Sequence, residues 1–214
     1  MRARSLGDAA ETLEQGRDLL AQRQPAKALA VFDALLQTNP DDIDARLGRV
    51  AALLYMGEPQ FALAACDTVL ITHPAHLDAL TLKCWALTTL RRYDEAEKIV
   101  EQRLQMSPES ATLWHTKAQM LIPQARWAEA ADSLDAALNL DPEMCEAWIS
   151  KGNVLLQMGN SADALSAFDR ALALQPDNSE AQSGRAQART AWRTAYTVGL
   201  LPGLIELLSA LFSR

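Results

Sequence analysis

Histidine side chains can ligate metals and move protons near neutral pH, and this sequence has three of them. His73 and His76 flank a proline in the stretch THPAH, and His115 stands apart. A metal site needs three or four ligands, and no third ligand of suitable type lies close to His73 and His76 in the sequence. We therefore interpret these two histidines as part of a solvated turn and expect no metal.

The three cysteines, Cys66, Cys84 and Cys145, are widely spaced and include no CxxC pair. An odd and scattered set of cysteines favours neither a disulfide framework nor a zinc site. Cys66 and Cys84 fall at positions that the repeat described below assigns to helix packing. We interpret them as small buried residues of a protein from a reducing compartment.

Common catalytic and nucleotide-binding motifs are absent from the sequence, including GxxxxGK[ST], GxGxxG, HExxH and GxSxG. Neighbouring acids such as Asp41 and Asp42, or Glu95 and Glu97, fall at turns and helix starts. Negative charge is favourable there because it interacts with the helix dipole. We therefore predict that the protein is not an enzyme and that it binds no cofactor.

The elements that must position any functional side chain recur along the sequence at a spacing of 34 residues. A proline, a leucine and an alanine each return at this spacing, which chance does not explain, so we predict a repeat array. The prolines are Pro40, Pro74, Pro108, Pro142 and Pro176, the leucines are Leu36, Leu70, Leu104, Leu138 and Leu172, and the alanines are Ala28, Ala62, Ala96, Ala130 and Ala164.

Each repeat has the pattern of two helices that pack on each other, and residues 145–178 show this pattern best. Apolar residues at helical spacing predict a first helix from about 146 to 158, which Gly159 ends, and a second from about 162 to 174. Pro176 follows the second helix. One such hairpin leaves apolar faces uncovered, so roughly three or more must stack to be stable.

The best repeat resembles the tetratricopeptide repeat (TPR) signature. The resemblance implies an all-α fold, a right-handed superhelical solenoid of five helix-turn-helix repeats with a capping helix and a short apolar helix after them. Large aromatics near the repeat start survive only as Trp114 and Trp148, which should change packing detail and leave the fold intact. The matching residues are Trp148, Gly152, Leu155, Ala164, Phe168, Ala171 and Pro176, and the predicted repeats are 9–42, 43–76, 77–110, 111–144 and 145–178, after a tail of residues 1–8.

In arrays of the family that this sequence resembles, successive first helices line a concave groove. Helical spacing gives the residues that would face that groove. We predict as the protein-binding groove Leu13, Arg17, Leu20, Asp44, Leu47, Ala51, Leu54, Tyr55, Asp78, Thr81, Trp85, Thr88, His115, Gln119, Ile149, Asn153 and Leu156.

The predicted groove is largely apolar with an acidic edge. Family members that clamp a terminal carboxylate use lysine, asparagine and arginine at such positions, and here only Arg17 and Asn153 come near that chemistry. We therefore expect the partner to be a peptide or amphipathic helix of a client protein, apolar with some positive charge. The alternative is that several of these apolar residues pack inside a tightly wound superhelix.

Two further segments follow the repeats. Residues 179–197 have the pattern of a capping helix, with Arg185, Arg189 and Arg193 on one face. Residues 198–214 form the most apolar stretch, too short to span a bilayer comfortably. Its apolar face could dock on the last repeat, on a second copy, on a client or on a membrane. That face contains Leu204, Ile205, Leu207, Leu208, Leu211 and Phe212.

The formal charge of −7 divides into −9 for residues 1–178 and +2 for residues 179–214. An acidic body repels phosphate backbones, so we predict no nucleic-acid binding. The N-terminal residues lack the apolar core of a secretory signal, and we expect a cytoplasmic location, with membrane association as the alternative.

These observations favour a non-enzymatic adaptor, scaffold or assembly factor that binds a client protein in its groove. The first alternative is a peripheral membrane protein held by its apolar C-terminal segment. The second is a regulatory subunit of an enzyme on another chain.

Overall fold

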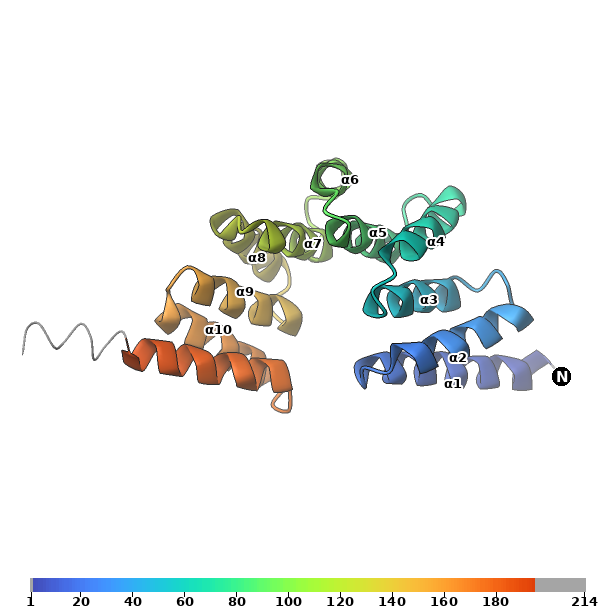
Figure 1. Cartoon of the computed structure of the whole chain (residues 1–214), viewed down its shortest axis with the longest axis horizontal. Coiled ribbons are helices and arrows are strands. Elements are labelled where there is room, and N and C mark those ends of the chain that lie inside the picture. The colour runs from blue at the N-terminus through green and yellow to red at the C-terminus, as the bar shows by residue number, and fades with distance from the viewer. Residues whose placement is uncertain (1, 195–214) are drawn as a thin grey trace, which may run out of the picture. The chain divides into compact units, whose positions relative to one another are not determined.

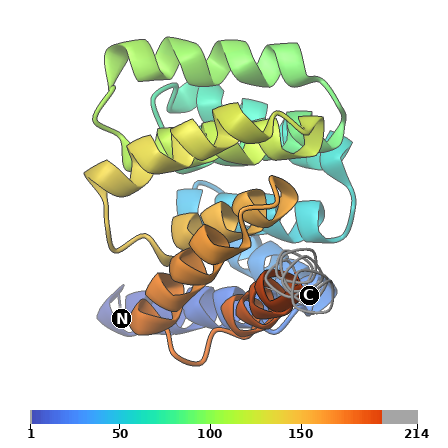
Figure 2. The same ribbon diagram turned by 90° about the vertical axis from the view of Figure 1, so that its left-hand side faces the viewer.

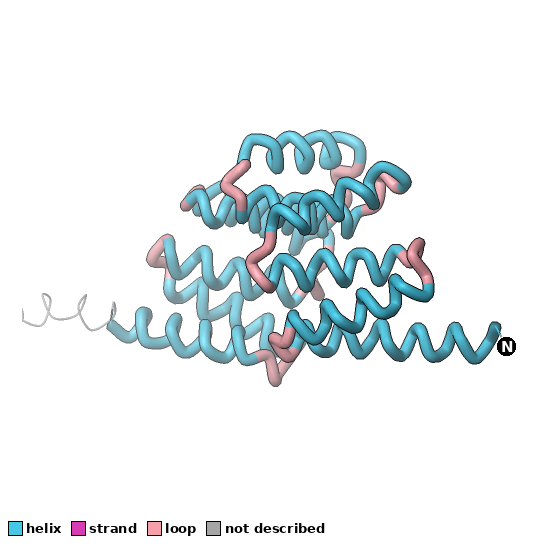
Figure 3. Tube along the Cα trace, turned by 45° about the vertical axis from the view of Figure 1, so that its right-hand side comes forward, coloured by secondary structure: helices cyan, strands magenta, loops and turns pink. Residues whose placement is uncertain are grey.

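The computed structural model describes the backbone of residues 2–194 and the side chains of residues 12–194. Within this part of the chain the secondary structure is helical and contains no strand, and short loops join the helices (Figure 3). The predicted all-α solenoid fold is confirmed, and the count of five repeats stays a prediction. The predicted apolar helix of residues 198–214 lies outside the described residues.

The chain divides into two compact units, Met1–Met106 (unit 1) and Ser107–Arg214 (unit 2). In unit 1 the first, third and fifth helices contact one another in succession, and each of the other helices packs beside them (Figure 1). The helices of unit 1 are α1 (Arg2–Ala21), α2 (Pro25–Thr38), α3 (Ile43–Tyr55), α4 (Pro59–Thr72), α5 (Leu77–Thr89) and α6 (Tyr93–Met106).

Unit 2 continues the same alternation of helices. α9, α10 and the helix of residues 179–194 lie side by side (Figure 2). α7 ends at Leu121 and passes into a short 3₁₀ helix that contains Pro123, because proline cannot donate the next helical hydrogen bond. The elements are α7 (Ala111–Leu121), η1 (Ile122–Gln124), α8 (Trp127–Leu140), α9 (Cys145–Gln157) and α10 (Ser161–Leu174).

The helix ends follow from local sequence. The Asp42 carboxylate accepts a hydrogen bond of 3.0 Å from the Ala45 backbone N–H at the start of α3, which satisfies one of the unpaired donors there. Ser110 does the same for α7. Each first helix ends in a turn that contains one residue with left-handed backbone, at Arg23, Gly57, Arg91, Ala125 and Gly159.

Two phenylalanine rings are each enclosed by a pair of glycines. Phe32 is fully buried, and a Cβ atom added to Gly16 would lie 2.6 Å from its ring, with Gly48 closing the other side. Phe168 is enclosed in the same way by Gly152 and Gly184. Only a residue without a side chain fits at these approaches.

The residues at the equivalent positions of other repeats are matched in size. Where Phe32 gives way to Cys66, the neighbours are the larger Val50 and Leu82. Where it gives way to Leu134, Ala118 packs against it. The core therefore stays filled because residue sizes are complementary. A large residue on an outer helix meets small residues on the flanking helices, and a small residue meets larger ones.

Ion pairs connect four of the outer helices, α2, α4, α8 and α10, to the helix that follows each of them. The acid and the base are always 16 residues apart in the sequence. All of these side chains are partly exposed, so each pair contributes about 0.2–1 kcal/mol. The pairs are Asp33–Arg49 at 2.7 Å, Asp67–Lys83 at 2.6 Å, Asp135–Lys151, and Asp169–Arg185 at 2.6 Å.

Candidate interaction faces

The predicted groove residues of unit 1 lie on α1, α3 and α5, the three helices that contact one another in succession. Contacts between side chains of neighbouring helices place several of them on one surface, which we call the inner face of unit 1. These contacts place on it Arg17, Asp44, Tyr55 and Trp85, and helical spacing along α3 and α5 adds Ala51, Asp78, Thr81 and Thr88.

An exposed aromatic pair is the most prominent feature of the inner face. The Tyr55 ring at the end of α3 meets the Trp85 ring of α5 edge to face, with centroids 5.1 Å apart and planes at 83°. Such a contact is favourable because the positive edge of one ring meets the negative face of the other. Tyr55 is 58% exposed and Trp85 is 38% exposed, so both rings remain available to a partner.

The carboxylates of the inner face differ in their pairing. Asp44, in the first turn of α3, accepts from the Arg17 guanidinium at 3.2 Å, and both side chains are about two-thirds exposed, at 67% and 65%. Asp78 occupies the equivalent position in the first turn of α5 and is exposed. Both acids are exposed.

Three apolar residues of the predicted groove belong to the core instead. Leu47 and Leu54 are each 7% exposed, and Ile149 is 5% exposed. Leu47 packs with Val69 of α4, so the gap between neighbouring helix pairs closes over it. The prediction of a continuous apolar trough is therefore wrong at these three positions, and among the predicted groove residues of unit 1 the large apolar side chains that stay exposed are Tyr55 and Trp85.

The other predicted residues vary in exposure. Leu13 and Leu20 of α1 are partly covered by the cluster around Phe32, and Leu156 of α9 by the cluster around Phe168. In all, the half-buried residues are Leu13, Leu20, Ala51, Thr81, Thr88, His115 and Leu156, and the exposed residues are Arg17, Asp44, Tyr55, Asp78, Trp85, Gln119 and Asn153.

In unit 2 the corresponding face is polar. The Gln119 side-chain amide of α7 donates to the Ser150 hydroxyl of α9 at 2.8 Å and lies 3.1 Å from His115 Nε2. Asn153 donates to the Glu180 carboxylate at 3.5 Å. Sequence reasoning missed Ser150 as a member of this cluster, because a serine inside an amphipathic helix carries no signal of its own.

Burial lowers the pKa of His115 below its ordinary value, and the nearby Glu146 carboxylate opposes this effect only in part. The neutral imidazole is therefore favoured, with Nε2 accepting from the Gln119 amide. The neighbours of His115 Nε2 are the uncharged side chains of Gln119 and Ser150, so this histidine belongs to a polar cluster between α7 and α9.

The cysteines behave as the sequence predicted and are buried. Burial raises the pKa of the Cys66 and Cys84 thiols to about 12, so both stay protonated and unreactive at neutral pH.

Across the described residues, no group of three metal-ligating side chains comes together. In the same part of the chain, no helix is both long enough and apolar enough to span a membrane.

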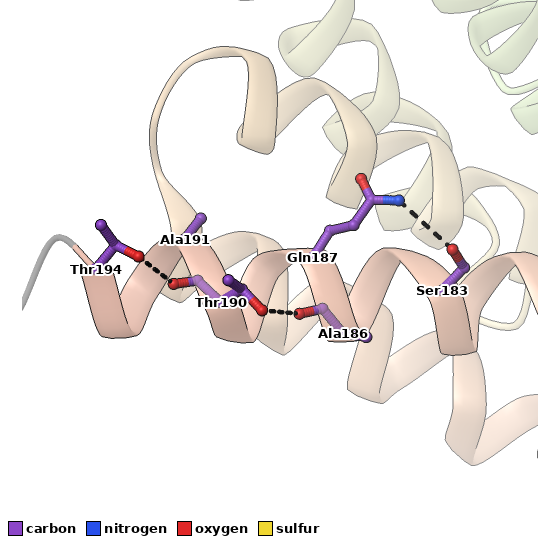
Figure 4. Close-up of a pocket in the computed structure, with 6 residues that line it drawn as sticks. All are labelled: Ser183, Ala186, Gln187, Thr190, Ala191 and Thr194. Atoms are coloured by element: carbon purple, nitrogen blue, oxygen red, sulfur yellow. Dashed lines mark hydrogen bonds between the residues drawn. The ribbon is translucent and has the colours of Figure 1, made fainter.

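A shallow hollow lies along one exposed face of the helix of residues 179–194 (Figure 4). Its threonine hydroxyls donate to carbonyls within the same helix, Thr190 to Ala186 at 3.0 Å and Thr194 to Thr190 at 2.9 Å. Gln187 lies 3.5 Å from the Ser183 hydroxyl. These polar groups form hydrogen bonds within the helix, so the surface of the hollow consists mainly of methyl groups.

Paired helices with size-matched cores, recurring along the described residues, define a helical-repeat protein. Two family models described as "Tetratricopeptide repeat" match the sequence, one over residues 145–178 and the other over residues 19–70 and 53–120. The chain belongs to the tetratricopeptide repeat family. Repeats of this family are in general non-catalytic interaction modules that bind proteins.

Solved structures share this fold. TTC0263, a thermophilic TPR protein of Thermus thermophilus, is 22% identical over 85% of this chain and 99% of its own, with a TM-score of 0.76. YrrB, a TPR protein with an unusual peptide-binding site, is 18% identical over 82% and 90%, with a TM-score of 0.51. MamA from Desulfovibrio magneticus RS-1 is 19% identical over 80% and 97%, with a TM-score of 0.50. A comparison with curated proteins gave no match.

Proposed function

We propose that the inner face of unit 1 binds a segment of a client protein and that the chain is a non-enzymatic adaptor or assembly factor. The observation that carries this proposal is the Tyr55–Trp85 pair, whose rings stay exposed on a surface between helices while the neighbouring Leu47 and Leu54 are buried. Tyrosine and tryptophan are the residues most often found to dominate protein interfaces.

The chemistry of the inner face supports an apolar anchor on the client. Two aromatic rings in contact form a rigid surface that loses little side-chain freedom when a partner binds. YrrB, which shares the fold, is a TPR protein with a peptide-binding site, and this supports a peptide-like client for this chain as well.

The test is affinity purification from cells with the wild type and with a Tyr55→Ala, Trp85→Ala double variant. Proteins lost only with the double variant are then measured for direct affinity. Truncating a buried interface aromatic costs about 2 kcal/mol or more, so we expect binding to weaken roughly 30-fold or more. Helical content by circular dichroism should stay near that of the wild type.

A Phe61→Ala, Ile71→Ala variant is the matched control, because these two residues are 66% and 80% exposed on the outer helix α4. It removes comparable apolar surface from a different face and should retain the client. If both double variants lose the same proteins, or if neither does, the inner face of unit 1 is not the client site. Tyr55→Ala alone, at a more exposed position than Trp85, tests the site should the double variant fold poorly.

A further inference from the structure

The Asp78 carboxylate stands on the same face of α5 as Trp85. Asp78, Thr81 and Trp85 are separated by three and four residues, which is the spacing of one helical face. Seven residues of α-helix put the carboxylate about 10 Å from the aromatic pair along the helix axis. An acidic group and an apolar anchor therefore occupy one surface at a fixed separation.

Asp78 differs in its pairing from the other acids at equivalent positions. Asp44, 34 residues earlier, pairs with Arg17 of the preceding first helix, and Glu180 accepts from Asn153 in the same way. The residue equivalent to Arg17 beside Asp78 is Ala51. Among the described side chains, no basic group forms an ion pair with Asp78, so its charge is open to a ligand.

We propose that this surface selects a client segment that carries a lysine or arginine three residues away from a large apolar residue in an extended chain. The apolar side chain would lie on the Tyr55–Trp85 pair and the cation on Asp78. Three residues of extended chain span about 10 Å, which matches the separation along α5. This inference rests on the proposed function and specifies its ligand.

Charge supports a cationic client over an anionic one. Residues 1–106 carry 12 basic and 15 acidic side chains, a formal charge of −3. The one arginine on the inner face, Arg17, is already paired with Asp44. An acidic segment would therefore meet an unpaired carboxylate and no free cation at this surface, which costs free energy instead of contributing it.

The test uses labelled synthetic peptides with a glycine–serine backbone, one leucine, and one arginine placed one to seven residues after it. Binding is measured by fluorescence anisotropy, and each peptide has a matched glutamine version. We expect tightest binding at a separation of three, with arginine preferred over glutamine by about two- to fivefold at low ionic strength, the range of exposed ion pairs. The preference should shrink toward unity at 1 M salt, where the Debye length is about 3 Å.

Asp78→Asn should remove the preference for arginine and leave binding of the glutamine peptide unchanged. Asp94→Asn, which deletes the same charge in the first turn of the outer helix α6, should keep the preference. Trp85→Ala should weaken both peptides. If Trp85→Ala weakens binding while Asp78→Asn leaves the preference for arginine intact, the proposed function stands, but the proposal that Asp78 binds the cation is overturned. Equal binding of arginine and glutamine peptides to the wild type also overturns it, as does tightest binding of the peptide whose arginine lies seven residues after the leucine.

Discussion

Five hairpin turns contain a left-handed residue at the same position, and only two of these residues are glycine. Gly57 has φ of 78°, and Ala125 has φ of 56°. A Cβ atom at Gly57 would have no neighbour within 4 Å. The cost of a side chain at this position is therefore conformational and does not come from crowding.

We predict opposite effects from a reciprocal pair of substitutions at these turns. Gly57→Ala should lower the free energy of unfolding by about 1 kcal/mol, because alanine disfavours positive φ. Ala125→Gly should raise it by about 0.5 kcal/mol, since the relief is partly offset by the greater freedom of glycine in the unfolded chain. Urea unfolding followed by circular dichroism measures both. Equal signs for the two variants would contradict this account of the turns.

The half-buried imidazole of His115 should make stability depend on pH. Its folded-state pKa is lowered, so the unfolded chain binds the proton more readily. The stabilisation is thus fully present above the ordinary value of about 6.5 and is lost as the pH falls below it. We predict that the decrease in unfolding free energy between pH 7.5 and 5.5 is smaller in His115→Gln than in the wild type.

The exposed loop residue His73 provides the comparison for that measurement. His73→Gln also removes one imidazole, but from an exposed position. An equal change in pH dependence for the two variants would mean that burial of His115 is not the cause.

How far the sequence predicts an individual residue depends on what surrounds it. Helical spacing correctly put Tyr55 and Trp85 on a solvent-facing surface and Cys66 and Cys84 inside. It was wrong for Leu47, because helical spacing within one helix does not report how closely the next helix pair approaches. The distance between neighbouring helix pairs depends on the sizes of side chains on other helices, 16 or more positions away in the sequence.

At the level of helices, the enclosure of Phe168 by Gly152 and Gly184 makes a sharp prediction. Gly184→Ala should destabilise by about 1–2 kcal/mol, because the clash with the ring, typically 1–3 kcal/mol, outweighs the better helix propensity of alanine. Ser183→Ala, at an exposed neighbour on the same helix, should be nearly neutral or stabilising.

A double variant identifies the cause of that loss. Phe168→Leu shortens the side chain, so adding Gly184→Ala to it should cost less than Gly184→Ala costs in the wild type. The coupling is read from a double-mutant cycle of unfolding free energies. Additive effects would show that the ring is not what excludes the methyl group.

Element boundaries were the most predictable feature of the chain. The first helix of the best repeat was expected from about 146 to 158 and is found at Cys145–Gln157, and the second, expected from about 162, begins at Ser161. Proline, glycine and capping residues act locally, so one sequence suffices to place them. The ion pairs between repeats were not predicted, since their partners lie on different helices and have no local signature.

At the largest scale, the extensive contacts among the described helices α1 to α10 join neighbours or next neighbours along the chain. Stability in such an array is approximately a sum of local terms, and a lesion should stay local. We predict that Phe32→Ala, which removes a fully buried ring at a cost of about 3–5 kcal/mol, speeds amide exchange in α1, α2 and α3 but not in α9 and α10.

Hydrogen exchange followed by mass spectrometry measures this difference, and Phe168→Ala should give the reverse pattern. A uniform increase in exchange along the chain for either variant would show that the array unfolds as one cooperative body.

The size matching between rings and glycines also gives the repeats a fixed order. Deleting residues 43–76 would keep every turn and cap in the remaining sequence and would bring Lys83 to the same 16-residue distance from Asp33 that Arg49 now has. It would also bring Leu82 to the place of Gly48, against the ring of Phe32. The Asp33–Lys83 ion pair could therefore form, but the Leu82 side chain would clash with the Phe32 ring. Loss of this repeat would therefore have to be followed by a compensating change at Phe32 or at Leu82 before the shortened array could fold as well as its parent.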